Sequence, residues 1–243
     1  MRYLRLVCRI TSITAQRLSA LGLSVALAAC VAPIPIKDQA PKVSYSSANG
    51  KVAVVVIDSR PVLKAEKKPL TFIGRAHGVF GIPTDMQIYP WVALKEEKDF
   101  TLAQELEQRI ADALQGTGAN VVRVAAGAHA DAASAKRAAQ ALDADRILLI
   151  TLDEWSVDVN LNWVGSFDFD WGYTVEVSDR AGAQMAIFKD SGQDVVKEHA
   201  SDSPRNMITV AYRVRLEKLL ERPELRSALS IPARVARQSG DQN

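Results

Sequence analysis

The sequence contains few residues of the types and spacings that carry catalysis. Its three histidines, His77, His129 and His199, are far apart, and neither His-Glu-x-x-His nor Gly-x-Ser-x-Gly occurs. The chain has two cysteines, Cys8 and Cys30, which are not spaced as a zinc-binding pair. We therefore predict no catalytic residue, no metal ligand and no cofactor, and expect that the protein is not an enzyme.

The acidic residues of the segment 153–176 are the best candidates for a cation site. The group comprises Asp153, Glu154, Asp158, Asp168, Asp170 and Glu176. On one strand face, Asp168 and Asp170 would lie about 7 Å apart and could bind a cation if other ligands joined them. Alternating acids on the wet face of an antiparallel sheet also serve solubility alone. We favour the solvated face, with a hydrolase or metal-dependent enzyme of unrecognised site as an alternative.

Asp58 and Arg60 are candidates for binding a partner. They follow the apolar run 51–57, which predicts a central strand buried on both faces. The carboxyl ends of such strands are where open α/β sheets commonly bind ligands. A capping or ion-pairing role at a loop would also explain both residues.

Arg75 and His77 are the second pair of candidates. They lie among the glycines of the segment 62–91, in which no periodicity predicts a helix or a strand. A structureless segment of this length is uncommon in a compact domain and is often functional. The planar guanidinium of Arg75 suits a carboxylate or phosphate. Alternatively, the glycines only make turns and the segment is solvated.

The strongest structural pattern is the alternating segment 155–177. Its apolar odd positions include Trp155, Val157, Val159, Leu161, Trp163, Phe167, Phe169, Trp171, Tyr173, Val175 and Val177. This alternation predicts strands with one face in the core. A single strand of this length would span roughly 75 Å, so we expect it to fold back at 160–162. The aromatic face could instead line a groove for a small molecule or lipid, but core packing accounts for it.

The remaining elements predict an α/β fold. Strands are expected at 119–124, 146–152 and 183–197, and helices at 99–115, 131–142 and from 203 to 223. The helix at 99–115 has the capping-box spacing of Thr101 and Gln104. Residues 51–230 should form a single two-layer domain, a mixed sheet of about five strands with helices mainly on one face, followed by a polar tail at 231–243.

The N-terminus predicts export. Four arginines precede a largely apolar run that ends in Leu27-Ala28-Ala29-Cys30, so residues 1–29 form an expected signal peptide. Pro33, Pro35 and Pro41 indicate a flexible tether at 30–50. The chain has 30 basic and 28 acidic residues, and the leader holds four of the basic ones. The mature chain is therefore not basic, and we expect no nucleic-acid partner.

The residues that end the leader look like the lipobox of bacterial lipoproteins, which implies a lipid on Cys30 as a membrane anchor. The order of lipobox, tether, a Val-rich strand ending in Asp-Ser-Arg-Pro, a helix closing at glycine, and a hairpin before a final helix resembles YajG-type bacterial lipoproteins. It is also similar to envelope lipoprotein domains that regulate cell-wall synthases. The resemblance implies a periplasm-facing α/β domain without established catalytic residues. Our leading hypothesis is a non-enzymatic envelope lipoprotein that binds another envelope protein or peptidoglycan. Because Val31 is not Asp, it implies the outer membrane.

Overall fold

The structure is a computed structural model that describes residues 32–45, 50–124, 131–161, 166–197 and 202–230. The predicted signal peptide, Cys30, the polar tail, His129, His199 and Trp163 lie outside these residues. Within the described residues, the chain from Pro33 onward forms one compact unit.

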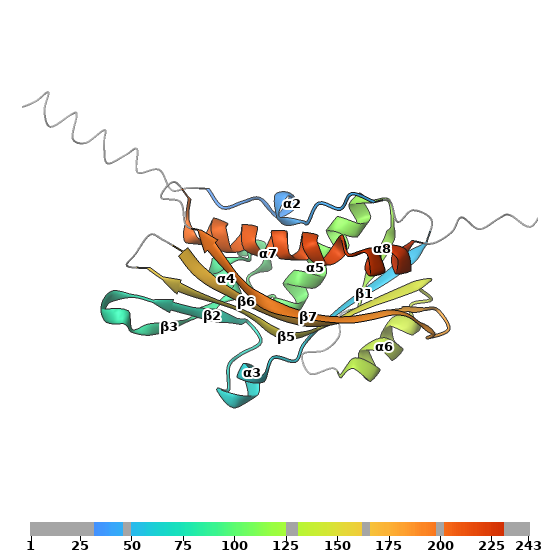
Figure 1. Cartoon of the computed structure of the whole chain (residues 1–243), viewed down its shortest axis with the longest axis horizontal. Coiled ribbons are helices and arrows are strands. Elements are labelled where there is room, and N and C mark those ends of the chain that lie inside the picture. The colour runs from blue at the N-terminus through green and yellow to red at the C-terminus, as the bar shows by residue number, and fades with distance from the viewer. Residues whose placement is uncertain (1–31, 46–49, 125–130, 162–165, 198–201, 231–243) are drawn as a thin grey trace, which may run out of the picture. The chain divides into compact units, whose positions relative to one another are not determined.

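The core of this unit is a mixed sheet of seven strands (Figure 1). The strands are β1 (Lys51–Asp58), β2 (Phe72–His77), β3 (Pro83–Gln87), β4 (Asn120–Arg123), β5 (Arg146–Asn160), β6 (Ser166–Asp179) and β7 (Gln184–Lys197). Their order is β3-β2-β5-β1-β4, with β6 paired to β5 and β7 paired to β6. The predicted α/β class and mixed sheet are confirmed, with two more strands than expected.

The long strand β5 pairs along one edge with β6 and along the other edge with two shorter strands, β1 and β2. The antiparallel β6 pairs with it from Arg146 to Asp158 and occupies one edge. On the other edge, β1 pairs in parallel with residues 146–152, and β2 pairs in parallel with residues 157–160. The central strand therefore joins two parallel pairings end to end.

A β-bulge at Asp153 changes which side of β5 faces the core. Before it, Leu148, Ile150 and Leu152 belong to the main hydrophobic cluster, and after it Trp155 and Val157 do. An extra residue in a strand reverses the alternation beyond it. The predicted inward positions of 155–177 are buried in the described residues, except Leu161, which lies in the turn after β5.

Most helices cover one face of the sheet, which we call the inner face (Figure 1). They are α2 (Ile36–Gln39), α4 (Ile88–Trp91), α5 (Leu102–Gly116), α7 (Pro204–Leu220) and α8 (Pro223–Leu229). On the other face, α6 (Ala132–Gln140) packs on β1 and β5 over a second hydrophobic cluster. The short α3 (Pro61–Ala65) buries no residue. The 3-10 helices η1 (Val79–Gly81) and η2 (Lys95–Glu97) complete the fold.

The segment 62–91 contains a β-hairpin, which corrects the prediction that no strand forms there. Strands β2 and β3 pair antiparallel, with Arg75 opposite Asp85. Gly74 has φ +140°, and a Cβ there would lie 2.0 Å from the Val157 carbonyl oxygen, so this close approach requires glycine. The alternation was hidden because the hairpin has a glycine and a register shift in β2 and exposed polar residues in β3.

The predicted flexible tether is docked over part of its length. Residues 33–45, here called the strap, lie along α7 (Figure 1). The Ile34 amide donates to Asn206 Oδ1 at 3.1 Å, and the Lys42 amide donates to Glu217 Oε1 at 3.0 Å. Prolines and the absence of periodicity concealed this docking, because the strap is held by side chains of a helix that lies about 170 residues later in the sequence.

The assignment of one face of β6 to the core and the other to solvent can be tested at two neighbouring positions. Phe169 is buried between Trp155 and Tyr212, with ring centroids 5.1 and 5.2 Å away. Phe169→Asp should therefore lower the free energy of unfolding by about 3–5 kcal/mol or abolish folding. Asp168→Asn changes an exposed side chain and should alter it by less than about 0.5 kcal/mol. Equal losses in urea melts would contradict the assignment of the two faces.

Candidate functional site

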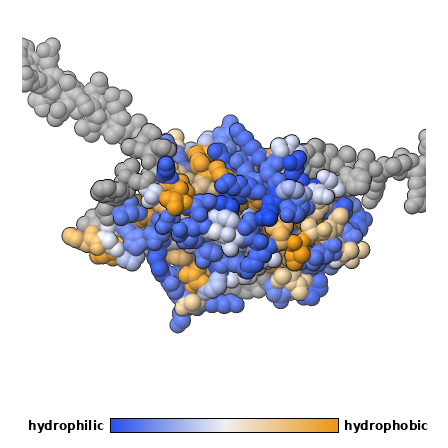
Figure 2. Space-filling view, in the orientation of Figure 1, coloured by the Kyte–Doolittle hydropathy of each residue, from blue (hydrophilic) through white to orange (hydrophobic). Residues whose placement is uncertain are grey.

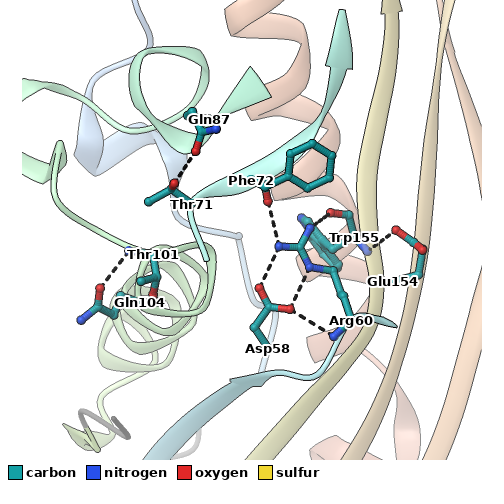
Figure 3. A network of polar contacts seen from close by, with 9 residues as sticks. All are labelled: Asp58, Arg60, Thr71, Phe72, Gln87, Thr101, Gln104, Glu154 and Trp155. Atoms are coloured by element: carbon teal, nitrogen blue, oxygen red, sulfur yellow. Dashed lines mark hydrogen bonds and ion pairs between the residues drawn. The ribbon is translucent and has the colours of Figure 1, made fainter. Parts of the chain in front are cut away.

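Arg60 occupies the gap between the two parallel strands that share β5 (Figure 3). Because β1 ends at Asp58 and β2 begins at Phe72, neither strand pairs with β5 around Trp155. Arg60 Nη1 donates to the Trp155 carbonyl and Nη2 donates to the Phe72 carbonyl, both at 2.8 Å. The guanidinium therefore satisfies backbone acceptors that a strand neighbour would otherwise satisfy.

Asp58 neutralises this guanidinium. Its Oδ1 accepts from Arg60 Nε at 2.8 Å, and its Oδ2 accepts from Arg60 Nη2 at 2.7 Å, which is a bidentate pair. The side chains of Arg60 and Asp58 are 0% and 2% exposed. As predicted from the sequence, both lie at the carboxyl end of β1, but their burial leaves neither available to a partner. The internal ion pair is the interpretation that the geometry supports.

The second pair of candidates lies on the face opposite α7. Arg75 and His77 are next to Asp158 and Asn160 in the parallel register of β2 and β5. Arg75 forms an ion pair with Glu66, and both side chains are about two-fifths exposed. The structure thus brings Arg75 and His77 together on one strand and separates them from the buried Asp58–Arg60 pair.

His77 is held between two acceptors. Its Nδ1 lies 3.2 Å from the Gly81 carbonyl oxygen, and its Nε2 lies 3.0 Å from Asp158 Oδ1. Both ring nitrogens carry a proton only in the imidazolium form. The bond to Gly81 and the contact with Asp158 therefore raise the pKa of His77 above 6.5, and the nearby Arg75 opposes them. The arrangement favours a cation on the sheet rather than a general base.

The surface around His77 is the half of the outer sheet that α6 does not cover. We call it the open face, and by register it comprises Arg75, His77, Asp158, Asp168, Asp170, Gln193, Val195 and Lys197. Asp158 pairs with Asp168, which in turn pairs with Val195 on β7. Among the described residues, α6 packs over β1 and the first half of β5, and at the β2 edge of the open face Glu66, the C-cap of the short α3, pairs with Arg75. The face presents carboxylates, two cationic groups near its β2 edge, and the exposed Val195 with Lys197 on β7.

The acids of the open face do not form a metal site in the described part of the chain. No group of three or more His, Cys, Asp or Glu side chains there could hold a metal ion. Asp170 accepts a hydrogen bond from Gln193 Nε2 at 2.9 Å, and Asp158 faces His77. Asp158 and Asp170 are thus engaged with neighbouring strands.

A buried charged cluster on α5 was not found from the sequence. Arg109 Nη1 and Nη2 donate to the two carboxylate oxygens of Glu97 at 2.9 and 2.7 Å, and all three charged side chains, including Glu105, are buried. Arg109 Nε lies 2.9 Å from Glu105 Oε1 but makes no well-aligned hydrogen bond with it. Burial raises the pKa of Glu105 to about 7. The cluster was missed because Glu97 comes from η2, outside the helical periodicity.

Glu107 is a second buried acid of α5. Its carboxylate accepts from the Val56 amide at 3.3 Å, beyond the point where β4 stops pairing with β1. Burial raises its pKa to about 7, although this hydrogen bond and Arg123 act in the opposite direction. The folded-state pKa of Glu107 lies above its unfolded value. The contribution of Glu107 to stability is therefore complete below about pH 4.5 and is lost as the pH rises through about 7.

The aromatic face of β6 is core and not a groove in the described residues. Trp171 is 8% exposed, and the guanidinium of Arg215 on α7 lies 3.6 Å from its ring centroid. Tyr173 stacks on Trp171 from β6 itself, with centroids 5.6 Å apart. A shallow hollow lies elsewhere, between the strap and α5, beside Lys42, Asp112 and Arg213. It does not border Asp58, Arg60 or the β2–β3 hairpin.

These features define a mixed-sheet α/β protein, and the chain is similar to several solved structures. One is a DUF330 protein from Xanthomonas campestris, with 9% identity, a TM-score of 0.47, and coverage of 77% of this chain and 91% of that chain. A second is the PelC dodecamer from Paraburkholderia phytofirmans, with 14% identity, a TM-score of 0.36, and coverage of 75% and 94%.

A third is the lipoprotein GNA1162 from Neisseria meningitidis, with 11% identity, a TM-score of 0.27, and coverage of 72% of this chain and 100% of that chain. No family model and no curated protein matches the sequence. At these identities and TM-scores, the similarities assign neither a family nor an activity. In the part of the chain that the structure describes, no helix is long and apolar enough to cross a membrane.

The structural role of Arg60 predicts a large effect on stability. Arg60→Ala would leave Asp58 as an unpaired buried charge and should lower the free energy of unfolding by about 3–5 kcal/mol. Arg75→Ala is the matched control, because its ion pair with Glu66 is exposed and should contribute less than about 1 kcal/mol. If Arg60→Ala melts in urea like Arg75→Ala, Arg60 does not hold the two strands together.

The contacts of His77 predict a measurable titration shift. By NMR, the His77 imidazole should titrate above pH 6.5, and Asp158→Asn should lower its pKa because the acceptor charge is removed. Asp168→Asn is the control, since this residue lies one strand further away and should have a smaller effect. A pKa below 6.5 in the parent protein would contradict the two-acceptor geometry.

Proposed function

We propose that this protein is a non-enzymatic envelope lipoprotein, anchored by lipid on Cys30, that binds another envelope protein through the open face. The observation that carries the binding proposal is the half of the outer sheet that α6 leaves uncovered in the described residues. The inner face of the same strands is closed by α7 and α8, so the two faces of β6 and β7 differ in their availability.

The anchor is supported by the sequence. The basic and apolar leader ends in Leu27-Ala28-Ala29-Cys30, as in bacterial lipoproteins, and the resemblance to YajG-type lipoproteins extends over the mature chain. Several acyl chains on one cysteine would give stable membrane attachment, whereas a single chain would be marginal. By the same resemblance, Val31 after the lipidated cysteine favours the outer membrane.

The charges on the open face favour a protein partner over peptidoglycan. Asp158, Asp168 and Asp170 occupy adjoining register positions on β5 and β6. The peptide stems of peptidoglycan carry carboxylates that these aspartates would repel, whereas Arg75 and His77 occupy only the β2 edge. A partner with basic side chains and an apolar group for Val195 matches the face better. Peptidoglycan contact through Arg75 and His77 remains the second candidate.

The test places a photo-crosslinking amino acid on each face of the protein. Substituted at Asp168, it should capture a protein in intact envelopes, and Arg75→Ala with His77→Ala should reduce the yield if the partner also contacts β2. Substitution at Lys218, which is exposed on α7, is the matched control. Mass spectrometry should find the mature N-terminus at Cys30 with lipid attached.

Equal capture from Asp168 and Lys218 would contradict the assignment of the open face as the binding surface. Capture of peptidoglycan fragments in place of protein would select the second candidate. An unlipidated Cys30 would contradict the anchor independently of either result.

A further inference from the structure

Three exposed apolar side chains gather at the far end of the sheet. Phe80 and Ile82, in the connection between β2 and β3, are 94% and 63% exposed, and Leu161 is 48% exposed. The Leu161 amide donates to the His77 carbonyl at 2.9 Å, which places the end of β5 beside this hairpin. We call these three residues the apolar tip. Figure 2 shows hydrophobic side chains at the projecting end of the β2–β3 hairpin.

The backbone holds Phe80 in an outward position. Its φ of 64° and ψ of 16° lie in the left-handed region, which bulky residues rarely adopt. The neighbouring Gly81 also has a positive φ. The hairpin thus closes through two residues with positive φ and exposes the ring of Phe80. This suggests that the ring contacts another surface.

The strap begins at this same end of the molecule. Lys197, the last residue of β7, pairs with the first residue of β6, and that end of β6 lies beside the end of β5. Helix α7 begins at Pro204, a few residues after β7 ends. Ile34 is hydrogen-bonded to Asn206 in the first turn of α7. Figure 1 shows the start of α7 and the β2–β3 hairpin toward the same end.

The chain between the anchor and the strap is short. Ile34 is four residues after Cys30, and four residues span at most roughly 14 Å when fully extended. The strap cannot lengthen this link without losing its hydrogen bonds to α7. A lipid on Cys30 would therefore hold the end of the sheet that carries the apolar tip close to the bilayer.

We propose that the apolar tip inserts into the headgroup region of the bilayer and forms a second membrane contact. This inference rests on the proposed lipid anchor. Three side chains bury too little area for independent binding, but the anchor supplies the high local concentration that makes a weak contact effective. The tip would set the orientation of the domain, with the strand ends toward the membrane.

The experiment places an environment-sensitive fluorophore on the mature, lipidated protein. Because Cys8 lies in the leader and Cys30 is acylated, Phe80→Cys would provide the reactive thiol. Met185→Cys is the matched control, since Met185 is 45% exposed at the opposite end of β7. Ile82→Cys is a second site at the tip. Each protein is reconstituted in phosphatidylethanolamine–phosphatidylglycerol vesicles with and without shallow doxyl-labelled lipid.

At Phe80→Cys and Ile82→Cys, emission should shift to the blue, and doxyl lipid should quench the fluorescence. At Met185→Cys, neither change should occur. Labels at the tip that remain solvent-like on vesicle-bound protein would overturn the membrane contact while leaving the anchor intact. Equal quenching at Met185→Cys would overturn the proposed orientation. Mass spectrometry that finds no lipid on Cys30 would overturn both the anchor and the inference.

Discussion

The structure depends on the way Arg60 joins two strands that share one edge of β5. Where β1 stops and β2 has not begun, the backbone acceptors of Trp155 and Phe72 are met by a single guanidinium that Asp58 neutralises. Isolated buried charges are costly, so this arrangement requires both partners and all of their hydrogen bonds. Through it, the β2–β3 hairpin is aligned with β1, and Arg75 and His77 reach the open face. The sequence pattern predicts Asp58 and Arg60 at a binding site. In the structure, they instead help to position the candidate site.

The parts of the fold that could be predicted are those with local signals. The alternation of 155–177, the apolar run of β1 and the capping box at Thr101 each depend on neighbouring residues, and the structure confirms the corresponding elements. The hairpin and the strap depend on distant partners. Gly74 is explained only by the backbone of β5, and Ile34 only by Asn206. For the same reason, His77 could be selected from the sequence, whereas its pairing with Asp158 could not.

The proposed anchor and the proposed binding surface are related through the strap. A free tether would let the domain sample many orientations, and the open face would meet partners at varied distances from the membrane. Docking of residues 33–45 on α7 removes most of that freedom. In this arrangement the conformational entropy of the linker is lost when the domain folds, and less remains to be lost when a partner binds.

The bulge at Asp153 gives β5 two different relations to its surroundings. Its first half has helices on both faces, since α5 lies on one side of the neighbouring β1 and α6 on the other, and both parities there are apolar. Its second half needs only one apolar side. The alternation of β5 therefore reverses at Asp153: even-numbered positions belong to the main hydrophobic cluster before it, and odd-numbered positions belong to that cluster after it. An insertion or deletion of one residue in the second half of β5 would turn its apolar side chains toward the open face.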